Sequence, residues 1–247
     1  YTLRTLFPYT TLFRSYECGV PALKNVSVQI KTGESVAFIG PNGSGKSTLM
    51  KLINGLVSPD RGIYNFEGVE INSKHLKDDI FLKSFHKKIG FIFQNSEVQL
   101  FCSNVYDEIA FGIRQMNMAE DEVNKRVEDI LNLLKVENLK HRQPYHLSGG
   151  EKRKIAIASV LVMNPDVLVF DEPMNGLDPE SKRFLKKLMI QLNEAGKTIL
   201  CSTHDFEYVE GVFKRVVVFS KDHTIIRDDD YREIMEDKEF LFENNII

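Results

Sequence analysis

Cysteine is scarce in this sequence of 247 residues, and its three copies, Cys18, Cys102 and Cys201, lie far apart. Their spacing matches neither the paired cysteines of a zinc site nor the dense framework of a disulfide-rich domain, and it is typical of a protein in a reducing cytosol. The six histidines also lack the spacing of metal ligands. The sequence therefore predicts no zinc, cobalt or nickel site on this chain.

Long hydrophobic runs and a strong charge imbalance are missing as well. The longest apolar runs, such as residues 155–163, are far shorter than the roughly 18 to 20 residues that a membrane-spanning helix needs. This predicts a soluble chain whose membrane role would require a separate partner. The net charge is −3, without the global basic character of a nucleic-acid-binding protein, so we expect no nucleic-acid partner.

Residues 1–15, "YTLRTLFPYTTLFRS", lack an initial methionine, an acidic residue and any strand or helix periodicity. They also lack the apolar stretch and cleavage site of a signal peptide. The segment resembles a translation of sequencing-adaptor DNA, and we expect it to be non-native. A genuine first β-strand is the alternative.

From residue 16 onward, short apolar runs alternate with helical patterns. Runs typical of strands lie at 23–30, 34–40, 88–94, 166–172, 197–203 and 214–220, with short antiparallel strands within 62–71, and helical patterns lie at 46–54, 103–135 and 148–163. This predicts an α/β fold with a mainly parallel sheet, antiparallel edge strands and an inserted helical subdomain. We expect one domain at 16–247, with its core at 16–94 and 165–247 and the helical subdomain at 95–164.

"GPNGSGKS" satisfies the pattern G-x-x-x-x-G-K-[ST] and lies between a predicted buried strand and a predicted helix. Glycines let backbone N–H groups converge on phosphate oxygens, and the N-terminus of the helix adds partial positive charge. Lys46 would neutralise the β- and γ-phosphates, and the Ser47 hydroxyl would coordinate Mg²⁺. The predicted nucleotide-binding residues are Gly40, Pro41, Asn42, Gly43, Ser44, Gly45, Lys46, Ser47 and Thr48.

A nucleotide site of this kind needs a metal-binding carboxylate at the end of another strand, and "LVFDE" provides two acidic residues there. We expect Asp171 to order the Mg²⁺ shell and Glu172 to act as the general base for an attacking water. Without the phosphate-binding loop, the same residues would indicate only a solvated strand end.

A second glycine pair occurs in "LSGGE", where Ser148 and Glu151 also match a helix capping box. A capped helix N-terminus with flanking glycines can bind an anion as well. Because the chain already has one phosphate-binding loop, the second site need not serve the same nucleotide and could serve one held by a neighbouring copy.

"LSGGE", placed between the phosphate-binding loop and "LVFDE", resembles the signature of ABC-type ATPases, and the resemblance extends from residue 16 to about 235. It implies the P-loop NTPase fold of these ATPases, ATP hydrolysis and a head-to-tail dimer. Ser148, Gly149 and Gly150 would then contact the γ-phosphate of ATP bound by Lys46 of the partner subunit.

The same resemblance implies roles for four more residues. Gln94 matches the Q-loop, which has catalytic and Mg²⁺-binding functions and links the site to the transmembrane partner. Asp178 matches the D-loop at the dimer interface, His204 the switch histidine, and Tyr16 the aromatic residue that stacks on adenine. Met174 and Glu151 depart from the usual Thr and Gln, at positions without a chemical role.

"FIFQNSEVQLFCSNVYDEIAFG", at 91–112, resembles the ATPases of cobalt and nickel importers and of energy-coupling factor vitamin importers, although Ser96 and Val98 replace the usual Pro and Asp. This implies a peripheral subunit on the cytoplasmic face of the membrane. Its partners would be a second ABC ATPase, identical or paralogous, a transmembrane coupling protein and an integral substrate-binding protein.

Two alternatives remain open at the level of sequence. Leu100 and Phe101 either form a docking groove for an apolar coupling helix or belong to the core of the helical subdomain. The chain could also be the ATPase of another ABC importer or of an exporter. Three other classes do not fit the sequence. A DNA-repair ABC ATPase would need long coiled coils, and an ABC translation factor would carry two cassettes in one chain. A P-loop kinase would not need the "LSGG" motif. The transported solute cannot be read from this sequence.

Overall fold

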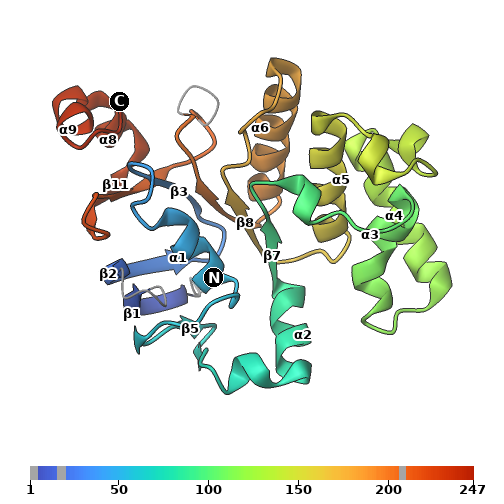
Figure 1. The fold of residues 1–247 in the computed structure, drawn as a ribbon, viewed down its shortest axis with the longest axis horizontal. Helices are drawn as coiled ribbons and strands as arrows, with labels where there is room; N and C mark the ends of the chain where they lie inside the picture. The colour runs from blue at the N-terminus through green and yellow to red at the C-terminus, as the bar shows by residue number, and fades with distance from the viewer. Residues whose placement is uncertain (1–4, 16–20, 206–209) are drawn as a thin grey trace.

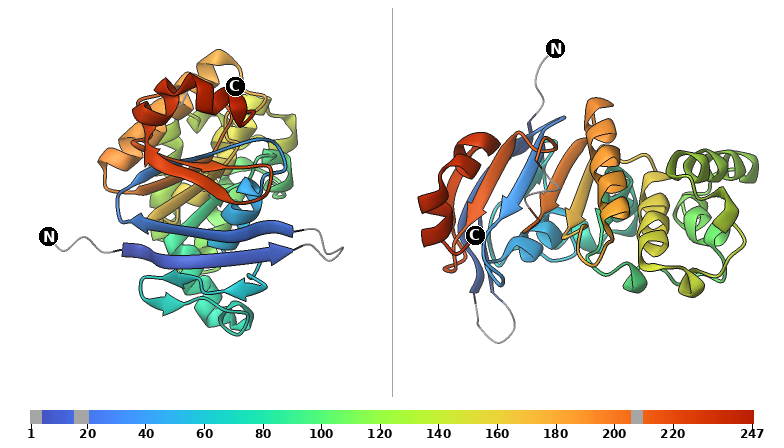
Figure 2. Two further views of the ribbon diagram at one scale, coloured as in Figure 1. Left: turned by 90° about the vertical axis from the view of Figure 1, so that its left-hand side faces the viewer. Right: turned by 90° about the horizontal axis from the view of Figure 1, so that it is seen from above.

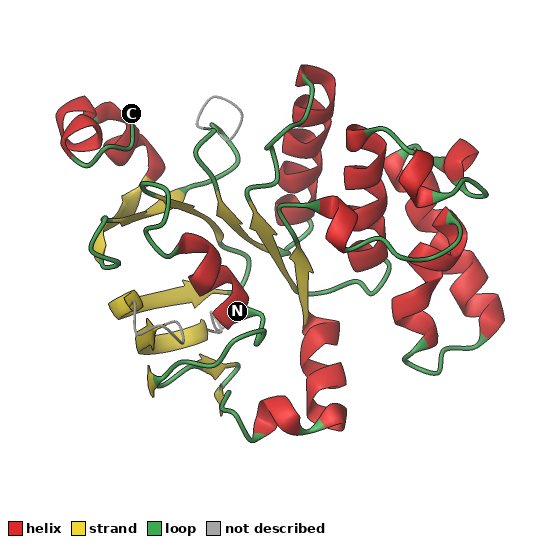
Figure 3. Ribbon diagram, viewed as in Figure 1, coloured by secondary structure: helices red, strands yellow, loops and turns green. Residues whose placement is uncertain are grey.

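The computed structural model describes residues 5–15, 21–205 and 210–247. Its centre is a six-stranded sheet in the order β11-β10-β3-β9-β8-β7 (Figures 1 and 3). The strands are β3 (Ser35–Ile39), β7 (Ile89–Ile92), β8 (Val167–Asp171), β9 (Thr198–Ser202), β10 (Arg215–Phe219) and β11 (Ile225–Asp230). All neighbouring pairs are parallel except β10–β11. This confirms the predicted mainly parallel sheet with an antiparallel edge. The edge strand is β11, however, whereas the short strands expected within 62–71 belong to other sheets.

The five parallel strands are mostly apolar and almost entirely buried because both faces of the sheet are covered. In β8, for example, Val167 and Val169 belong to one core cluster, whereas Leu168 and Phe170 belong to the other. The first cluster also contains side chains of β2 and α1, and the second contains side chains of α3 to α6, α8 and α9. Side chains of opposite pleats therefore anchor the sheet to two different layers.

The first layer includes a smaller antiparallel sheet in the order β2-β1-β4, formed by β1 (Thr5–Ser15), β2 (Pro21–Lys31) and β4 (Arg61–Gly62). The long pair β1 and β2 crosses the left view of Figure 2. Residues 5–15 thus form a strand, which was the alternative expectation for this segment, although its register with β2 shifts at four points. That the segment is non-native stays a prediction. A hairpin of β5 (Asn65–Phe66) and β6 (Val69–Glu70) follows.

The helices fall into two groups. α1 (Lys46–Ile53) and α2 (Asp79–Lys88) lie on the side of the small sheet, and α6 (Pro179–Glu194), α8 (Tyr231–Glu236) and α9 (Lys238–Glu243) cover the opposite face. α3 (Val105–Arg114), α4 (Glu120–Leu134) and α5 (Gly149–Leu161) pack on one another at the far end of the molecule (Figures 1 and 2). Short 3₁₀ turns occupy His75–Lys77, Ser96–Val98, Glu137–Leu139 and Pro144–His146.

The predicted helical stretch at 103–135 is divided in the structure, because the chain turns between Arg114 and Glu120 with Asn117 at φ 56°. The sequence did not predict α2, in which Phe85 is the only buried side chain and Ile80 is 84% exposed. Phe81, Leu82 and Phe85 lie on one face of the helix at helical spacing, but the exposed Ile80 beside them obscures this pattern in the sequence. Among the described residues, none of the helices has both the length and the apolar character needed to cross a bilayer.

Candidate active site

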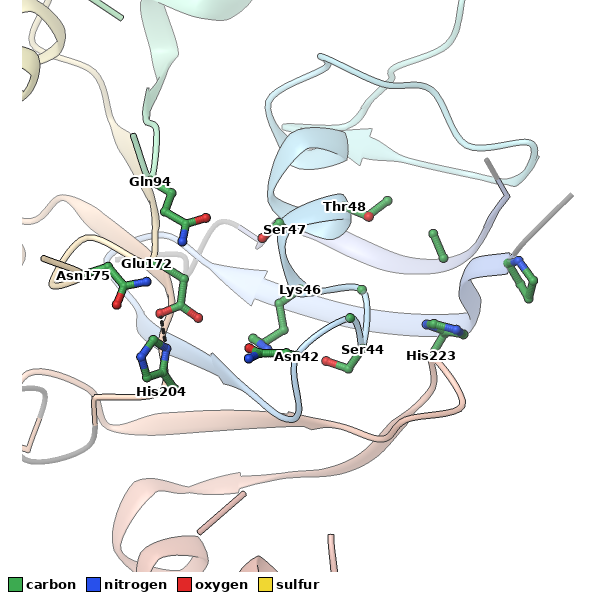
Figure 4. A pocket seen from close by; sticks show the side chains of 14 residues that line it. Asn42, Ser44, Lys46, Ser47, Thr48, Gln94, Glu172, Asn175, His204 and His223 are labelled. Atoms are coloured by element: carbon green, nitrogen blue, oxygen red, sulfur yellow. Dashed lines mark ion pairs between the residues drawn. The ribbon is translucent and has the colours of Figure 1, made fainter. Parts of the chain in front are cut away.

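A cavity of about 620 Å³ opens where the parallel strands end (Figure 4). Ligands bind in open α/β sheets at this edge, because the loops that follow the strands all meet there. The cavity is lined by the phosphate-binding loop and by residues from five further segments. The lining residues are Pro21, Ala22, Asn42, Gly43, Ser44, Gly45, Lys46, Ser47, Thr48, Gln94, Glu172, Asn175, His204 and His223.

Two glycines of the predicted loop occupy positions that other residues could hardly take. Gly45, which precedes α1, has φ 107°, and a Cβ there would lie 2.2 Å from the carbonyl oxygen of Ala22. Gly40 has φ 142°, and a Cβ there would lie 2.4 Å from the carbonyl oxygen of Phe219. The loop therefore follows a path against β2 and β10 that depends on glycine. This path brings backbone N–H groups to the N-terminus of α1, as an anion-binding loop requires.

Lys46 is the central cation of the cavity. Its Nζ donates to the carbonyl oxygens of Gly40 at 2.7 Å and Pro41 at 3.0 Å, and the residue is only 6% exposed. Burial lowers the pKa of the Lys46 ammonium group, while the carboxylates of Glu172 and Asp171 act in the opposite direction. The ammonium group is thus held against the carbonyl oxygens of the phosphate-binding loop, near the carboxylates of Glu172 and Asp171. Because it is buried, its interactions with other charges are weakly screened.

Asp171 joins the phosphate-binding loop to the sheet. Its Oδ1 accepts hydrogen bonds from the Ser47 hydroxyl at 2.9 Å and from the Ser202 hydroxyl at 2.6 Å. Asp171 and Ser202 are register partners at the ends of β8 and β9. Ser47 and Asp171 were both predicted Mg²⁺ ligands, and the fold places their oxygens side by side.

Glu172, the next residue, has a strained backbone with φ 47°. Such a left-handed conformation is uncommon for a residue other than glycine and persists only where the surroundings hold it. Here the Glu172 N–H donates both to the carbonyl oxygen and to the hydroxyl of Ser202, each at 3.0 Å. Glu172 Oε2 lies 2.8 Å from Nδ1 of His204, which is the contact drawn in Figure 4. The strain turns the carboxylate into the cavity and toward the imidazole.

The second glycine pair lies apart from this cavity. Ser148, Gly149 and Gly150 are not among its lining residues, but Gly149 and Gln94 both line an adjacent cavity of about 420 Å³. Both hydrogen bonds of the predicted capping box are present, with the Glu151 carboxylate accepting from the Ser148 N–H at 2.8 Å and the Glu151 N–H donating to the Ser148 hydroxyl at 3.3 Å.

Asp178 lies beside the second glycine pair rather than in the first cavity. It caps α6 by accepting from the N–H groups of Glu180 and Ser181, and a Cβ added to Gly150 would lie 3.5 Å from Asp178 Oδ2. Tyr16, the predicted adenine-stacking residue, lies outside the described residues.

Five residues of the site were not predicted from the sequence, and two of them, Pro21 and Ala22, line the cavity at the start of β2. Ser202 binds Asp171 and Glu172, whereas Asn175 and His223 line the cavity, with His223 at the opposite end from Glu172 and His204 (Figure 4). Ser202 could have been found, because "CSTHD" places a hydroxyl two residues before His204 at the end of a predicted strand. His223 sits in the turn between β10 and β11, and no motif marks it.

Comparisons with known proteins agree with one another. The family described as ABC transporter matches residues 23–175. A protein of Clostridium acetobutylicum described as an ABC transporter ATP-binding protein is 62% identical over 92% of this chain and 94% of its own length. The nickel import ATP-binding protein LarO of Lactiplantibacillus plantarum is 42% identical over 85% of this chain and 86% of its own.

Solved structures that are more than 25% identical to this chain share its fold. CbiO1 of Clostridium perfringens, part of the ABC transporter complex CbiONQ, is 35% identical with a TM-score of 0.84, and the match covers 98% of this chain and 95% of that one. A dimeric ATP-binding cassette in a post-hydrolysis state with ADP and Pi is 31% identical with a TM-score of 0.80, over 92% of this chain and 97% of that one.

The hydrogen bonds of Ser202 lead to a first prediction. Replacing Ser202 by Ala removes a buried donor to a carboxylate, so the free energy of unfolding should fall by about 1 to 3 kcal/mol. Ser35→Ala is the matched control, because the Ser35 hydroxyl is buried in the neighbouring strand β3 and has no partner among the described residues. Its removal should leave stability unchanged or raise it. Urea unfolding measures both, and equal losses would contradict the assigned role of Ser202.

Proposed function

The chain belongs to the ABC transporter family, and from this membership we propose that it is the ATP-hydrolysing subunit of a membrane importer. One observation carries the proposal: Lys46, Ser47 and the Glu172–His204 pair line one cavity at the edge of the sheet. Asp171, behind the cavity wall, accepts a hydrogen bond from Ser47. Phosphate transfer needs this combination of a cation, a metal site and a base.

The residues present fit ATP with Mg²⁺. The cavity has the size of a small-molecule site, and the buried hydroxyl of Ser44 in the loop has no hydrogen-bond partner within the described part of the chain. Ser47 and Asp171 present the hard oxygen ligands that Mg²⁺ prefers, with Gln94 as a further ligand. The metal would neutralise charge on the phosphate oxygens. Lys46 would exchange its two carbonyl contacts for those oxygens.

Glu172 is the proposed general base. Its carboxylate points into the cavity, and His204 at 2.8 Å fixes its orientation. His204 itself is 54% exposed on the open side, so the imidazole can also reach a γ-phosphate. Water attack needs a base that is held in position, and the contact of Glu172 with His204 provides this.

Glu172→Gln tests the base directly. The amide keeps the size of the side chain and its contact with His204 but cannot take a proton, so ATP turnover should fall by about 100-fold or more. ATP binding should persist, and the variant should accumulate as an ATP-bound dimer. Phosphate release and equilibrium ATP binding, measured on the same preparation, separate the two effects.

The control is Glu194→Gln on the exposed end of α6, which makes the same chemical change far from the cavity. It should hydrolyse ATP at the normal rate. Normal turnover in Glu172→Gln would remove Glu172 from the mechanism.

The proposed active unit is a head-to-tail dimer. Ser148 and Gly149 are exposed at the N-terminus of α5, away from the Lys46 cavity of their own chain, so they are free to meet a nucleotide on another cassette. Asp178, which lies beside Gly150, would then lie at the interface. The similar cassette with ADP and Pi is a dimer, which supports this arrangement. The second cassette is either a copy of this chain or a paralogue.

We assign the importer to the class that carries cobalt or nickel ions, or vitamins by an energy-coupling factor. The segment 91–112 supports this, as do the relatives named for nickel import and for the CbiONQ complex. The chain would bind peripherally to the cytoplasmic face, together with a transmembrane coupling protein and an integral substrate-binding protein. An ATPase of another importer or an exporter is the alternative, and the neighbouring genes would distinguish them.

The docking surface for the membrane partner centres on Phe101. This side chain is 66% exposed and packs edge-to-face on Phe111, with ring centroids 4.9 Å apart. Leu100 instead packs on the core. Of the two residues, Leu100 therefore fits the core alternative and Phe101 fits the docking alternative. The buried Glu108 carboxylate accepts from the N–H groups of Phe101 at 2.8 Å and Cys102 at 2.7 Å and holds the phenyl ring outward.

Phe101→Asp should abolish co-purification with the membrane partner and leave the melting temperature and ATP binding unchanged, because the ring contributes little to the core. Leu133→Asp is the control, since Leu133 is 51% exposed on α4. It should co-purify normally. Normal capture of Phe101→Asp, or a loss of folding in that variant, would contradict the docking role.

A further inference from the structure

Arg153 connects the signature helix to the segment that carries Gln94. It lies on α5, three residues after Gly150, and is 5% exposed. Its Nη1 donates to the carbonyl oxygen of Phe93 at 2.6 Å and its Nη2 to that of Gln94 at 2.5 Å. One planar guanidinium group therefore holds two consecutive peptide groups at the point where the chain leaves β7.

Two further contacts tie the same segments together. Nε2 of Gln99 donates to the carbonyl oxygen of Ala156 at 2.9 Å and to the Ser159 hydroxyl at 3.2 Å, and Lys152 forms a surface ion pair with Glu97. Residues 93–99 and the first three turns of α5 are thus fastened at several points. Arg153 is the innermost of these contacts and the only one that holds the backbone of Gln94 among those described.

The chemistry of Arg153 is unusual for a purely structural contact. Its acceptors are neutral carbonyls, no described carboxylate contacts it, and its Nε has no partner among the described residues. Burial lowers the pKa of the guanidinium group, which reflects the unfavourable removal of a charge from water. A buried ion without a counter-ion is weak evidence for added stability and is better explained by a need for specific geometry.

The two ends of this connection reach different parts of the site. The Gln94 side chain faces Glu172 and Ser47 across the large cavity (Figure 4), and Gln94 also lines the adjacent cavity together with Gly149 and Arg153. From Arg153 to Gly150 the distance along the helix axis is only about 5 Å. A displacement of Gln94 therefore reaches the signature glycines through two hydrogen bonds and less than one turn of helix.

We propose that Arg153 is a positioning residue that makes Gln94 and the signature segment move as one body. Nucleotide contact at Gln94 in one cassette then orients Ser148, Gly149 and Gly150 toward the nucleotide of the partner cassette. This rests on the proposed function, because it assumes that Gln94 contacts bound ATP and that the signature acts in trans. Arg153 contacts neither nucleotide and acts only through Gln94 and α5.

The test compares Arg153→Met and Arg153→Lys with the control Lys152→Met in the isolated protein. Arg153→Met removes both hydrogen bonds, so kcat should fall by about 5- to 150-fold and the Hill coefficient for ATP should approach 1. ATP affinity measured without Mg²⁺, where no turnover occurs, should stay within about twofold. Arg153→Lys keeps the charge but can reach one carbonyl at best, and it should be intermediate.

Lys152→Met removes a surface ion pair on the same helix and should retain wild-type kcat and cooperativity. Wild-type kcat and Hill coefficient in both Arg153 variants would overturn the proposal. So would a loss of ATP affinity that parallels a fall in melting temperature in both variants. If Arg153→Met does not fold, Arg153→Lys decides the question. Absence of ATP hydrolysis in the wild type and in Lys152→Met would instead contradict the proposed function.

Discussion

The site depends on one carboxylate oxygen. Oδ1 of Asp171 accepts from Ser47 on α1 and from Ser202 on β9, so it joins the phosphate-binding loop to two strands of the sheet. The parallel register of β8 and β9 makes this possible, because their carboxyl ends meet at one edge. Ser202 also holds the strained backbone of Glu172. The proposed metal site and the proposed catalytic base therefore share one support.

Local patterns were sufficient to predict most of this arrangement. The glycine loop and "LVFDE" are each short contiguous motifs that follow an apolar strand run, so the place of each in the fold can be read from its own neighbours in the sequence. Contacts between distant segments could not be predicted in this way: the hydrogen bonds of Ser202 to Asp171 and Glu172, and those of Arg153 to Phe93 and Gln94, join residues far apart in the chain. The sequence also could not show which of Leu100 and Phe101 faces outward. That depends on the hydrogen bonds from the N–H groups of Phe101 and Cys102 to the Glu108 carboxylate.

In the proposed dimer each cassette would carry two half-sites that face different nucleotides. The Lys46 cavity would hold phosphates within the chain, whereas the capped N-terminus of α5 is exposed and separate from that cavity. Gln94 lies between them and lines both cavities. Hydrolysis would then require two cassettes, which lets a membrane partner control the ATPase through the approach of the two subunits. Phe101, close to Gln94 in the chain, would contact that membrane partner.

The central claim is that the signature serves the nucleotide of a partner cassette, and mixing two inactive variants tests it most directly. Lys46→Ala loses its hold on the phosphates, whereas Ser148→Arg should bind ATP normally and block the site of its partner. If the chain pairs with itself, random mixing yields about half mixed dimers, each with one intact composite site, so ATPase activity should recover to roughly a quarter of wild type. Normal turnover by the Ser148→Arg homodimer would contradict the account.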